Sequence, residues 1–373
     1  MATLESFDRI LEKHISEKDM PGAAYTVVVG GKTLYENCIG HANIEKDLPI
    51  TPKTIMRLAS MTKPITGVAV LKAQELGLLS LGDPVEKYLP EFADLMVADI
   101  EDGKVVGTHP FTNHLTVLDL LNHTSGIGMG TVPTEALARI SFEDTLATGI
   151  PHYARQPLDW EPRTATGYSA TMAFDVACRI VEIASGMEYF AFIKKYILDP
   201  LGMEDTVYEL SSEQESRLAV MYHCAEGKVV PSRPEQMILN NVPPTYRCGG
   251  TQMYSTLADY TKFARMLCGS GEVDGVRVLS PESVDAMATS TLPEAIRCGA
   301  WEEWGISVRV IQVKQDWQVL NPGAFGWSGA YETHFFVDRK LDMCAVLFKN
   351  VTSGLGAGAV TAREFEAEVM KLF

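Results

Sequence analysis

The stretch RLASMTKP at residues 57–64 opens a segment of helical pattern that continues to about residue 79. Proline is tolerated in a helix only within the first turn, where the amide donors have no partner, so Pro64 places the start of this helix near Ser60. The three-residue offset then puts Lys63 on the same face as Ser60, one turn further along. A hydroxyl and an amine are therefore predicted to lie side by side at the beginning of a helix.

This pair suits nucleophilic catalysis, because a serine hydroxyl is a poor nucleophile until a base removes its proton. A neutral Lys63 could take that proton, and the positive end of the helix would favour the resulting negative charge. The tetrapeptide Ser-x-x-Lys is weak by itself, since 20 serines and 17 lysines in 373 residues produce about one by chance. On these residues alone, the simpler interpretation is Ser60 as a helix cap beside a solvated Lys63.

Strand-like segments lie at the two ends of the chain, and helical patterns dominate the middle. Two β-rich runs flank Gly30-Gly31 and predict a hairpin. Apolar residues recur at helical spacing in the first sixteen positions. The further predicted strands are 305–313, 331–338 and 341–349, and the further predicted helices are 115–122, 170–185, 189–198, 257–268 and 361–373.

The economical arrangement of these elements is an α+β fold with one antiparallel sheet built from both chain termini and flanked by helices. A mainly helical domain is then inserted between the two halves of the sheet. We place the sheet domain at residues 1–80 and 280–373 and the inserted domain at residues 81–279. The active site is expected in the cleft between them.

Three further segments give the Ser-x-x-Lys pair a context. They are LLNHTSG at residues 120–126, Tyr168-Ser169 just before a predicted helix, and GWSGAY at residues 326–331. In this order, with Ser60 and Lys63, they resemble the serine β-lactamase and penicillin-binding-protein superfamily. The resemblance is strongest to class C β-lactamase-like carboxylesterases and transacylases of the family VIII type. It covers nearly the whole chain and implies a β-lactamase/transpeptidase-like fold.

The resemblance implies roles for several residues. Ser60 would be the acyl-accepting nucleophile, Lys63 its probable base, and Tyr168 the group that shuttles protons to the leaving group. The backbone amides of Ser60 and Ala330 would form the oxyanion hole. The segment around His123 would be a structural turn that shapes the cleft.

Two substrate-binding motifs depart from the family pattern. The second motif is usually Tyr-x-Asn, whereas Ala170 here lacks the side-chain amide that contacts substrate and lysine. The third motif, Lys-Thr-Gly in true β-lactamases, is Trp327-Ser328-Gly329 here. The family lysine binds a carboxylate, while an indole offers an apolar face and one N–H donor. Both departures point away from anionic β-lactams.

The sequence therefore predicts a serine hydrolase, most simply a carboxylesterase on small neutral esters. An amidase or D-aminopeptidase-like enzyme and an acyltransferase remain alternatives, because they share the acyl-enzyme. A non-catalytic relative that binds a ligand in the same cleft is the alternative from a different class. The oligomeric state is left open.

Composition and residue spacing also bear on the partners, location and cofactors of the protein. The formal net charge of −16 argues against a nucleic-acid partner. No stretch approaches the 18 apolar residues of a membrane span, and the first twenty residues show no secretory signal, so a cytoplasmic protein is expected. The cysteines and histidines show no metal-ligand spacing, and we expect neither a metal nor a cofactor.

A rival nucleophile lies in the third motif itself. The sequence GWSGA at residues 326–330 nearly matches the Gly-x-Ser-x-Gly elbow of α/β-hydrolases. That fold requires an acid and then a histidine downstream, together with further strands and helices. Only His334 follows Ser328, and 45 residues remain, so we reject Ser328 as the nucleophile of such a fold.

Overall fold

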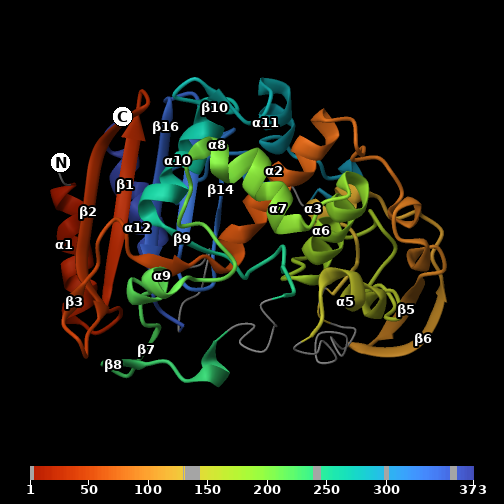
Figure 1. Ribbon diagram of the computed structural model, residues 1–373, viewed down its shortest axis with the longest axis horizontal. Helices are drawn as coiled ribbons and strands as arrows, with labels where there is room; N and C mark the ends of the chain where they lie inside the picture. The colour runs from red at the N-terminus through yellow and green to blue at the C-terminus, as the bar shows by residue number, and fades with distance from the viewer. Residues whose placement is uncertain (1–3, 129, 131–142, 238–244, 298–301, 353–358) are drawn as a thin grey trace.

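The computed structural model describes residues 4–128, 130, 143–237, 245–297, 302–352 and 359–373. Its main element is an eight-stranded antiparallel sheet to which both ends of the chain contribute (Figure 1). In spatial order the strands are β12 (Glu302–Trp304), β13 (Arg309–Ile311), β14 (Phe325–Ser328), β15 (His334–Asp338), β16 (Met343–Lys349), β1 (Gly22–Val29), β2 (Lys32–Asn43) and β3 (Leu48–Pro49). The predicted α+β fold with a sheet from both termini is confirmed.

The hairpin β1–β2 turns at the two glycines that predicted it. Gly30 and Gly31 have φ values of 58° and 70°, a left-handed conformation that glycine adopts without steric cost. Strand β1 then pairs with β16 over seven residue pairs, from Ala23↔Lys349 to Val29↔Met343. This pairing joins the N-terminal and C-terminal halves of the sheet.

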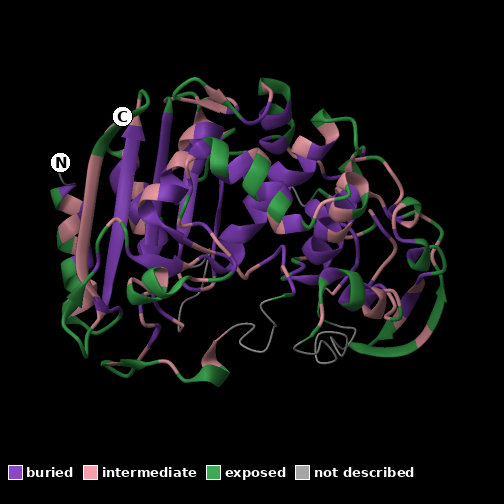
Figure 2. Ribbon diagram, in the orientation of Figure 1, coloured by how far each residue is buried: buried purple, intermediate pink, exposed green. Residues whose placement is uncertain are grey.

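Each face of the sheet is covered by helices (Figure 2). On one face, α1 (Glu5–Ser16) and α12 (Val360–Met370) pack Phe7 and Phe365 against Tyr25 and Phe336 of the sheet. The other face is covered by α2 (Thr62–Glu75) and α10 (Leu257–Cys268), and it carries the larger core. That core extends without a break into the helical part of the chain.

The helical part lies to the right of the sheet in Figure 1. The predicted helix 257–268 is found at those residues as α10, and the one predicted at 170–185 begins two residues later. It ends at Gly186, whose φ is 66°. The remaining helices are α3 (Val117–Leu121), α5 (Leu146–Tyr153), α6 (Met172–Ser185), α7 (Tyr189–Ile193, continued by a π turn over 194–198), α8 (Asp199–Leu201), α9 (Ser212–Ser216) and α11 (Pro281–Met287).

Short hairpins interrupt this helical part and were not predicted. The longest joins β5 (Met96–Glu101) and β6 (Lys104–Pro110), turns at Asp102-Gly103, and lies at the end of the molecule away from the sheet (Figure 1). The other small strand pairs are β4 (Ile55–Arg57) with β9 (Tyr254–Thr256), β7 (Tyr222–Ala225) with β8 (Lys228–Pro231), and β10 (Glu272–Val273) with β11 (Val276–Arg277).

One predicted strand is wrong in its extent. Residues 305–313 were expected to form a single strand, but only residues 309–311 do so, as β13. Ser307 has a φ of 64°, which turns the chain back so that β12 and β13 form a hairpin. The left-handed residue breaks the extended run that the β-branched side chains favour.

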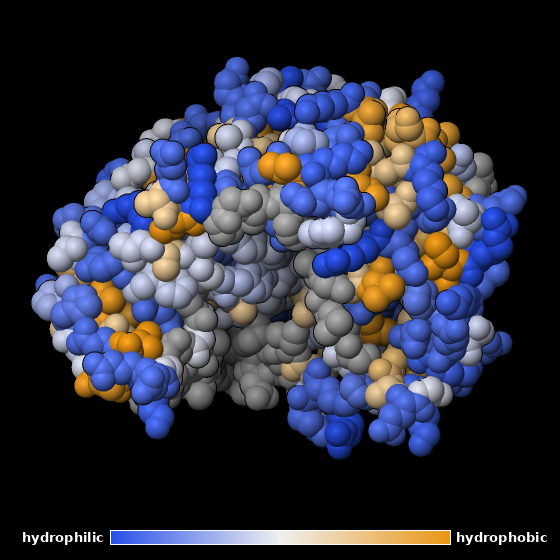
Figure 3. All heavy atoms as spheres, turned by 180° about the vertical axis from the view of Figure 1, so that it is seen from behind, coloured by the Kyte–Doolittle hydropathy of each residue, from blue (hydrophilic) through white to orange (hydrophobic). Residues whose placement is uncertain are grey.

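The surface agrees with the acidic, charged composition. Figure 3 shows hydrophobic residues in small groups among hydrophilic ones over the back face. No helix in the described part of the chain is long and apolar enough to cross a membrane.

Candidate active site

The proposed nucleophile lies between strand β4 and helix α2, in a 3₁₀ turn over Ala59–Met61. The regular helix begins two residues after Ser60, at Thr62, and Pro64 is its third residue. Ala59 has a φ of 47°, a left-handed conformation that costs a non-glycine residue free energy and is typical of functional sites. The helix start is therefore close to the position that Pro64 predicted.

The structure brings the three predicted catalytic side chains together. The Ser60 hydroxyl oxygen lies 2.7 Å from the Tyr168 hydroxyl and 3.3 Å from the Lys63 Nζ. Lys63 is fully buried, whereas the Tyr168 side chain is partly exposed beside it. Ser60 thus lies between a buried amine and a phenol at the surface. Each of these groups is close enough to exchange a proton with the Ser60 hydroxyl.

Two main-chain carbonyls hold the amine. Lys63 Nζ donates to the Ala170 carbonyl at 2.6 Å and to the Gly250 carbonyl at 2.9 Å. Ala170 therefore contacts the lysine through its backbone, although it lacks the family's side-chain amide. A Cβ on Gly250 would lie 2.7 Å from the Ala170 oxygen and 3.3 Å from Nζ, so only glycine fits there. Sequence reasoning missed the Gly250 carbonyl, because a backbone acceptor 187 positions from Lys63 gives no local signal beside it.

A buried carboxylate holds the loop that contains Gly249 and Gly250. Asp175 on α6 accepts hydrogen bonds from the Gly249 amide at 2.9 Å and from the Tyr246 and Tyr153 hydroxyls at 3.0 and 3.2 Å. Thr66 on α2 donates to the Gly249 carbonyl at 2.8 Å. Burial raises the pKa of Asp175 to about 6. The loop that holds Lys63 therefore rests on a carboxyl that ionises near neutral pH.

This raised pKa predicts a pH-dependent stability. The native Asp175 carboxyl keeps its proton to a higher pH than the unfolded one, so the free energy of unfolding falls as the pH rises from about 4 to 7. The fall is of order 2–3 kcal/mol, because one pKa unit corresponds to about 1.4 kcal/mol. Asp175→Asn should lack this fall when urea unfolding is measured at pH 4.5 and pH 7.5.

Asp205→Asn is the matched control, with the opposite sign. The hydrogen-bonded Arg217 lowers the pKa of Asp205, so that carboxylate stabilises the fold above pH 4 and loses its effect in acid. Equal pH profiles for the wild type and Asp175→Asn would contradict the assignment of a raised pKa to Asp175.

His123 holds the tyrosine segment on both sides. Its Nδ1 accepts from the Ser169 amide at 3.1 Å, and its carbonyl accepts from the Gly167 amide at 3.1 Å. Its ring centroid lies 4.9 Å from that of Tyr168. Burial lowers the pKa of His123 well below its ordinary value, which keeps the ring neutral. This geometry agrees with the structural role expected for the HTSG segment.

Aromatic side chains form a wall beside the nucleophile. The Trp327 ring centroid lies 5.4 Å from that of Tyr168 and 5.0 Å from that of Trp304. Trp304 stacks on Tyr168 with a centroid separation of 6.1 Å. Sequence reasoning missed Trp304, because it lies just before the predicted strand 305–313, and the β12–β13 hairpin that carries it to the site was not predicted.

The third motif begins at the end of strand β14, which is not an edge strand of the sheet. Strand β14 lies between β13 and β15, and only its last two residues, Trp327 and Ser328, pair on one side alone. Gly329 follows, and a Cβ there would lie 2.3 Å from the Leu58 carbonyl oxygen. This close approach brings the turn next to the segment of the nucleophile, and Ala330 packs against the cluster of Ala59, Met221 and Tyr331.

Ser328 does not point its side chain toward the nucleophile. Side chains alternate along a strand, and Trp327 belongs to the core that contains α2, whereas the Ser328 hydroxyl lies 2.7 Å from His334 Nδ1. His334 Nε2 in turn lies 3.1 Å from Glu366 on helix α12. The Ser328 side chain is thus engaged by His334, and substrate binding by Ser328 stays a prediction.

The contact of Ser328, His334 and Glu366 resembles a catalytic triad in residue types. All three residues are buried, and burial lowers the pKa of His334 so that its ring is neutral. The group lies on the sheet face covered by α1 and α12, away from Tyr168 and Lys63. This placement agrees with the rejection of Ser328 as the nucleophile.

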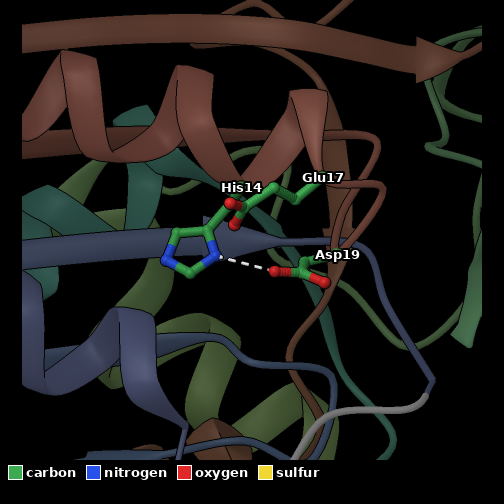
Figure 4. A group of neighbouring side chains, drawn as sticks. All are labelled: His14, Glu17 and Asp19. Atoms are coloured by element: carbon green, nitrogen blue, oxygen red, sulfur yellow. Dashed lines mark hydrogen bonds and ion pairs between the residues drawn. The ribbon is translucent and has the colours of Figure 1, made fainter. Parts of the chain in front are cut away.

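One group among the described residues has the spacing of a metal site (Figure 4). It consists of His14, Glu17 and Asp19. His14 Nδ1 lies 3.0 Å from Asp19, and its Nε2 lies 2.8 Å from Glu364 on helix α12. Because carboxylates occupy both ring nitrogens, the geometry is that of an ion-paired histidine that joins the two terminal helices.

Comparison with known proteins places this site in a family. Residues 7–367 match the family model described as Beta-lactamase. Protein Rv1367c of Mycobacterium tuberculosis is 32% identical over 370 residues, which cover 95% of this chain and 91% of that protein. Esterase EstB of Burkholderia gladioli is 28% identical, over 95% of this chain and 92% of that protein.

Solved structures show the same fold. The hydrolase EstCE1, described as having promiscuous acyltransferase activity, superposes with a TM-score of 0.80 at 21% identity and covers 98% of both chains. Simvastatin synthase (LovD) from Aspergillus terreus superposes with a TM-score of 0.83 at 21% identity, over 100% of this chain and 99% of that one. The chain therefore belongs to the β-lactamase family of serine hydrolases.

Proposed function

We propose that this chain is a carboxylesterase that forms an acyl-enzyme on Ser60 and acts on small neutral esters. The observation that carries the proposal is the position of the Ser60 hydroxyl between Lys63 and Tyr168, with Trp327 beside it where β-lactamases have lysine. The name of the EstB relative supports ester substrates.

The proposed reaction has two halves. Lys63 takes the Ser60 proton while the hydroxyl oxygen attacks the ester carbonyl, and the amides of Ser60 and Ala330 donate to the oxyanion. The C–O bond to the alcohol then breaks, and the proton passes through Tyr168 to the departing alkoxide. Water attacks the acyl-enzyme in the second half, loses a proton to the same pair, and releases the acid and free Ser60.

Acyl transfer is the second candidate, because an alcohol can replace water in the second half. The names of EstCE1 and simvastatin synthase point in this direction. A panel of nitrophenyl esters, with and without added alcohols, separates the two outcomes by the yield of free acid against new ester. Mass spectrometry of the trapped protein should locate the acyl group on Ser60 in both cases.

Trp327 is predicted to set the preference for neutral substrates. A charge-assisted hydrogen bond contributes about 1.5–3 kcal/mol, so its absence weakens carboxylate recognition roughly 10- to 150-fold. Trp327→Lys should therefore shift the ratio of kcat/KM for a neutral ester to that for a chromogenic cephalosporin toward the cephalosporin. Trp327→Phe keeps an apolar face without a charge and is expected to leave the ratio near the wild-type value.

A wild-type protein that prefers the cephalosporin would contradict this interpretation of the third motif. A ratio that does not respond to Trp327→Lys would contradict it as well.

A further inference from the structure

The turn after β14 carries the proposed oxyanion donor, and hydrogen bonds to main-chain carbonyls hold it. The Gly329 amide donates to the Thr333 carbonyl at 2.7 Å, and the Glu332 amide donates to the Gly329 carbonyl at 2.9 Å. Thr333 Oγ1 donates to the Leu58 carbonyl at 2.9 Å. Glu332 itself has a φ of 63°, so the turn contains a non-glycine residue in the left-handed region.

The side chain of Glu332 links this turn to a buried lysine. Its carboxylate forms an ion pair with Lys349, the last residue of β16. Lys349 Nζ also donates to Thr361 Oγ1 at 2.6 Å, and Thr361 is the second residue of α12. The turn is thereby tied to the central strand of the sheet and to a helix on its far face.

Both partners of this pair are removed from solvent. Lys349 is 4% exposed, and the side chain of Glu332 is 13% exposed. Burial lowers the pKa of Lys349 to about 7, and the charges of Cys224, Glu364 and Asp19 act in the opposite direction. Removing one partner of a buried ion pair leaves an uncompensated charge, whereas removing both does not.

We propose that Glu332 and Lys349 are positioning residues that hold the turn so that the Ala330 amide faces the developing oxyanion on Ser60. This inference rests on the proposed function, because it concerns the oxyanion hole of that reaction. Neither side chain touches the reacting atoms. Their effect passes through the backbone of residues 330–332, where misplacement of a donor by a fraction of an ångström weakens transition-state stabilisation.

The first test is Glu332→Gln, assayed with a nitrophenyl ester. We expect kcat to fall about 10- to 100-fold with KM changed less than about threefold, since outright loss of an oxyanion donor costs on the order of 10²- to 10³-fold. Glu332→Asp keeps the charge but shortens the side chain, and its kcat should lie between those of the wild type and Glu332→Gln. It also serves if the glutamine variant does not fold.

The second test separates positioning from stability. The double variant Glu332→Gln/Lys349→Met removes both charges and should recover most of the Tm lost in Glu332→Gln, while kcat stays low. The control Asp205→Asn breaks the hydrogen-bonded ion pair with Arg217 and should lower Tm without lowering kcat. It reports what a loss of stability alone does to the rate.

Three outcomes would overturn the inference. A wild-type kcat in both Glu332 single variants would do so, and so would a kcat that recovers with Tm in the double variant. In either case, labelling of wild-type Ser60 by a serine-reactive phosphonate would show that the proposed function itself stands. If wild-type Ser60 takes no label, the proposed function and the inference fail together.

Discussion

Ser60→Ala is expected to abolish turnover of a short-chain nitrophenyl ester, with kcat falling on the order of 10⁴- to 10⁶-fold. The reason is that Ser60 carries the only hydroxyl that the described structure places within hydrogen-bond distance of both Lys63 and Tyr168. Without it, water must attack the ester directly, and the two halves of the reaction collapse into one unassisted step. The fold should be unchanged, because alanine fits wherever serine does.

The site of labelling provides the sharpest measurement. A fluorophosphonate should add one adduct to the wild type, map to Ser60 by peptide mass spectrometry, and fail to label Ser60→Ala. Ser328→Ala is the discriminating control, since Ser328 contacts His334, and His334 in turn contacts Glu366, on the other face of the sheet. It should still be labelled at Ser60. An adduct on Ser328 or on a cysteine would contradict the assignment.

The parts of the site that could be predicted are those written in local sequence. Pro64 marks the start of a helix, and a helix start fixes the relation of Ser60 to Lys63 through three residues of known geometry. Gly30-Gly31 marks a hairpin for the same kind of reason. Tyr168 could be placed beside them only through the resemblance to a family, because 105 positions of chain separate it from Lys63.

The parts that could not be predicted depend on contacts between distant segments. The two carbonyls that hold Lys63 belong to Ala170 and Gly250, which lie 107 and 187 positions from it in the chain. Trp304 reaches the aromatic wall only because Ser307 turns the chain back. These positions follow from the packing of α2 against α6 and from the turn at Ser307, which no short window of sequence records.

Two other features of the structure, the β5–β6 hairpin and the direction of the Ser328 side chain, did have signals in the local sequence. The Asp102-Gly103 pair between two β-rich runs is a strong hairpin signal, and it would have predicted β5–β6 within the helical part. The alternation of side chains along β14 places Trp327 and Ser328 on opposite faces. Applied to the third motif, that rule separates the two side chains, so that Trp327 lies beside Tyr168 and the Ser328 hydroxyl beside His334.

The contacts of Lys63 are compatible with a neutral amine that acts as a base. A neutral amine has two N–H donors and one lone pair, and the two carbonyls of Ala170 and Gly250 take the two donors. The lone pair then remains for the third direction, toward the Ser60 hydroxyl at 3.3 Å. Tyr168 can donate to the same hydroxyl oxygen at 2.7 Å, which completes a chain of donors that runs toward the lysine. In this arrangement a neutral Lys63 can accept the proton of the Ser60 hydroxyl.

Lys63→Arg is therefore expected to be nearly as damaging as Lys63→Ala, with kcat lowered about 10²- to 10⁴-fold in both variants. A guanidinium keeps the positive charge but does not deprotonate in a protein, so it has no lone pair to offer Ser60. Lys72→Arg is the matched control on the same helix, where the side chain forms an ion pair with Glu75 at 3.3 Å and should accept the exchange. The comparison isolates proton removal from charge. If Lys63→Arg keeps more than about a tenth of the wild-type kcat, a positive charge alone suffices at this position. The group that removes the Ser60 proton then lies elsewhere, and the Tyr168 hydroxyl, 2.7 Å from the Ser60 hydroxyl, is the next candidate.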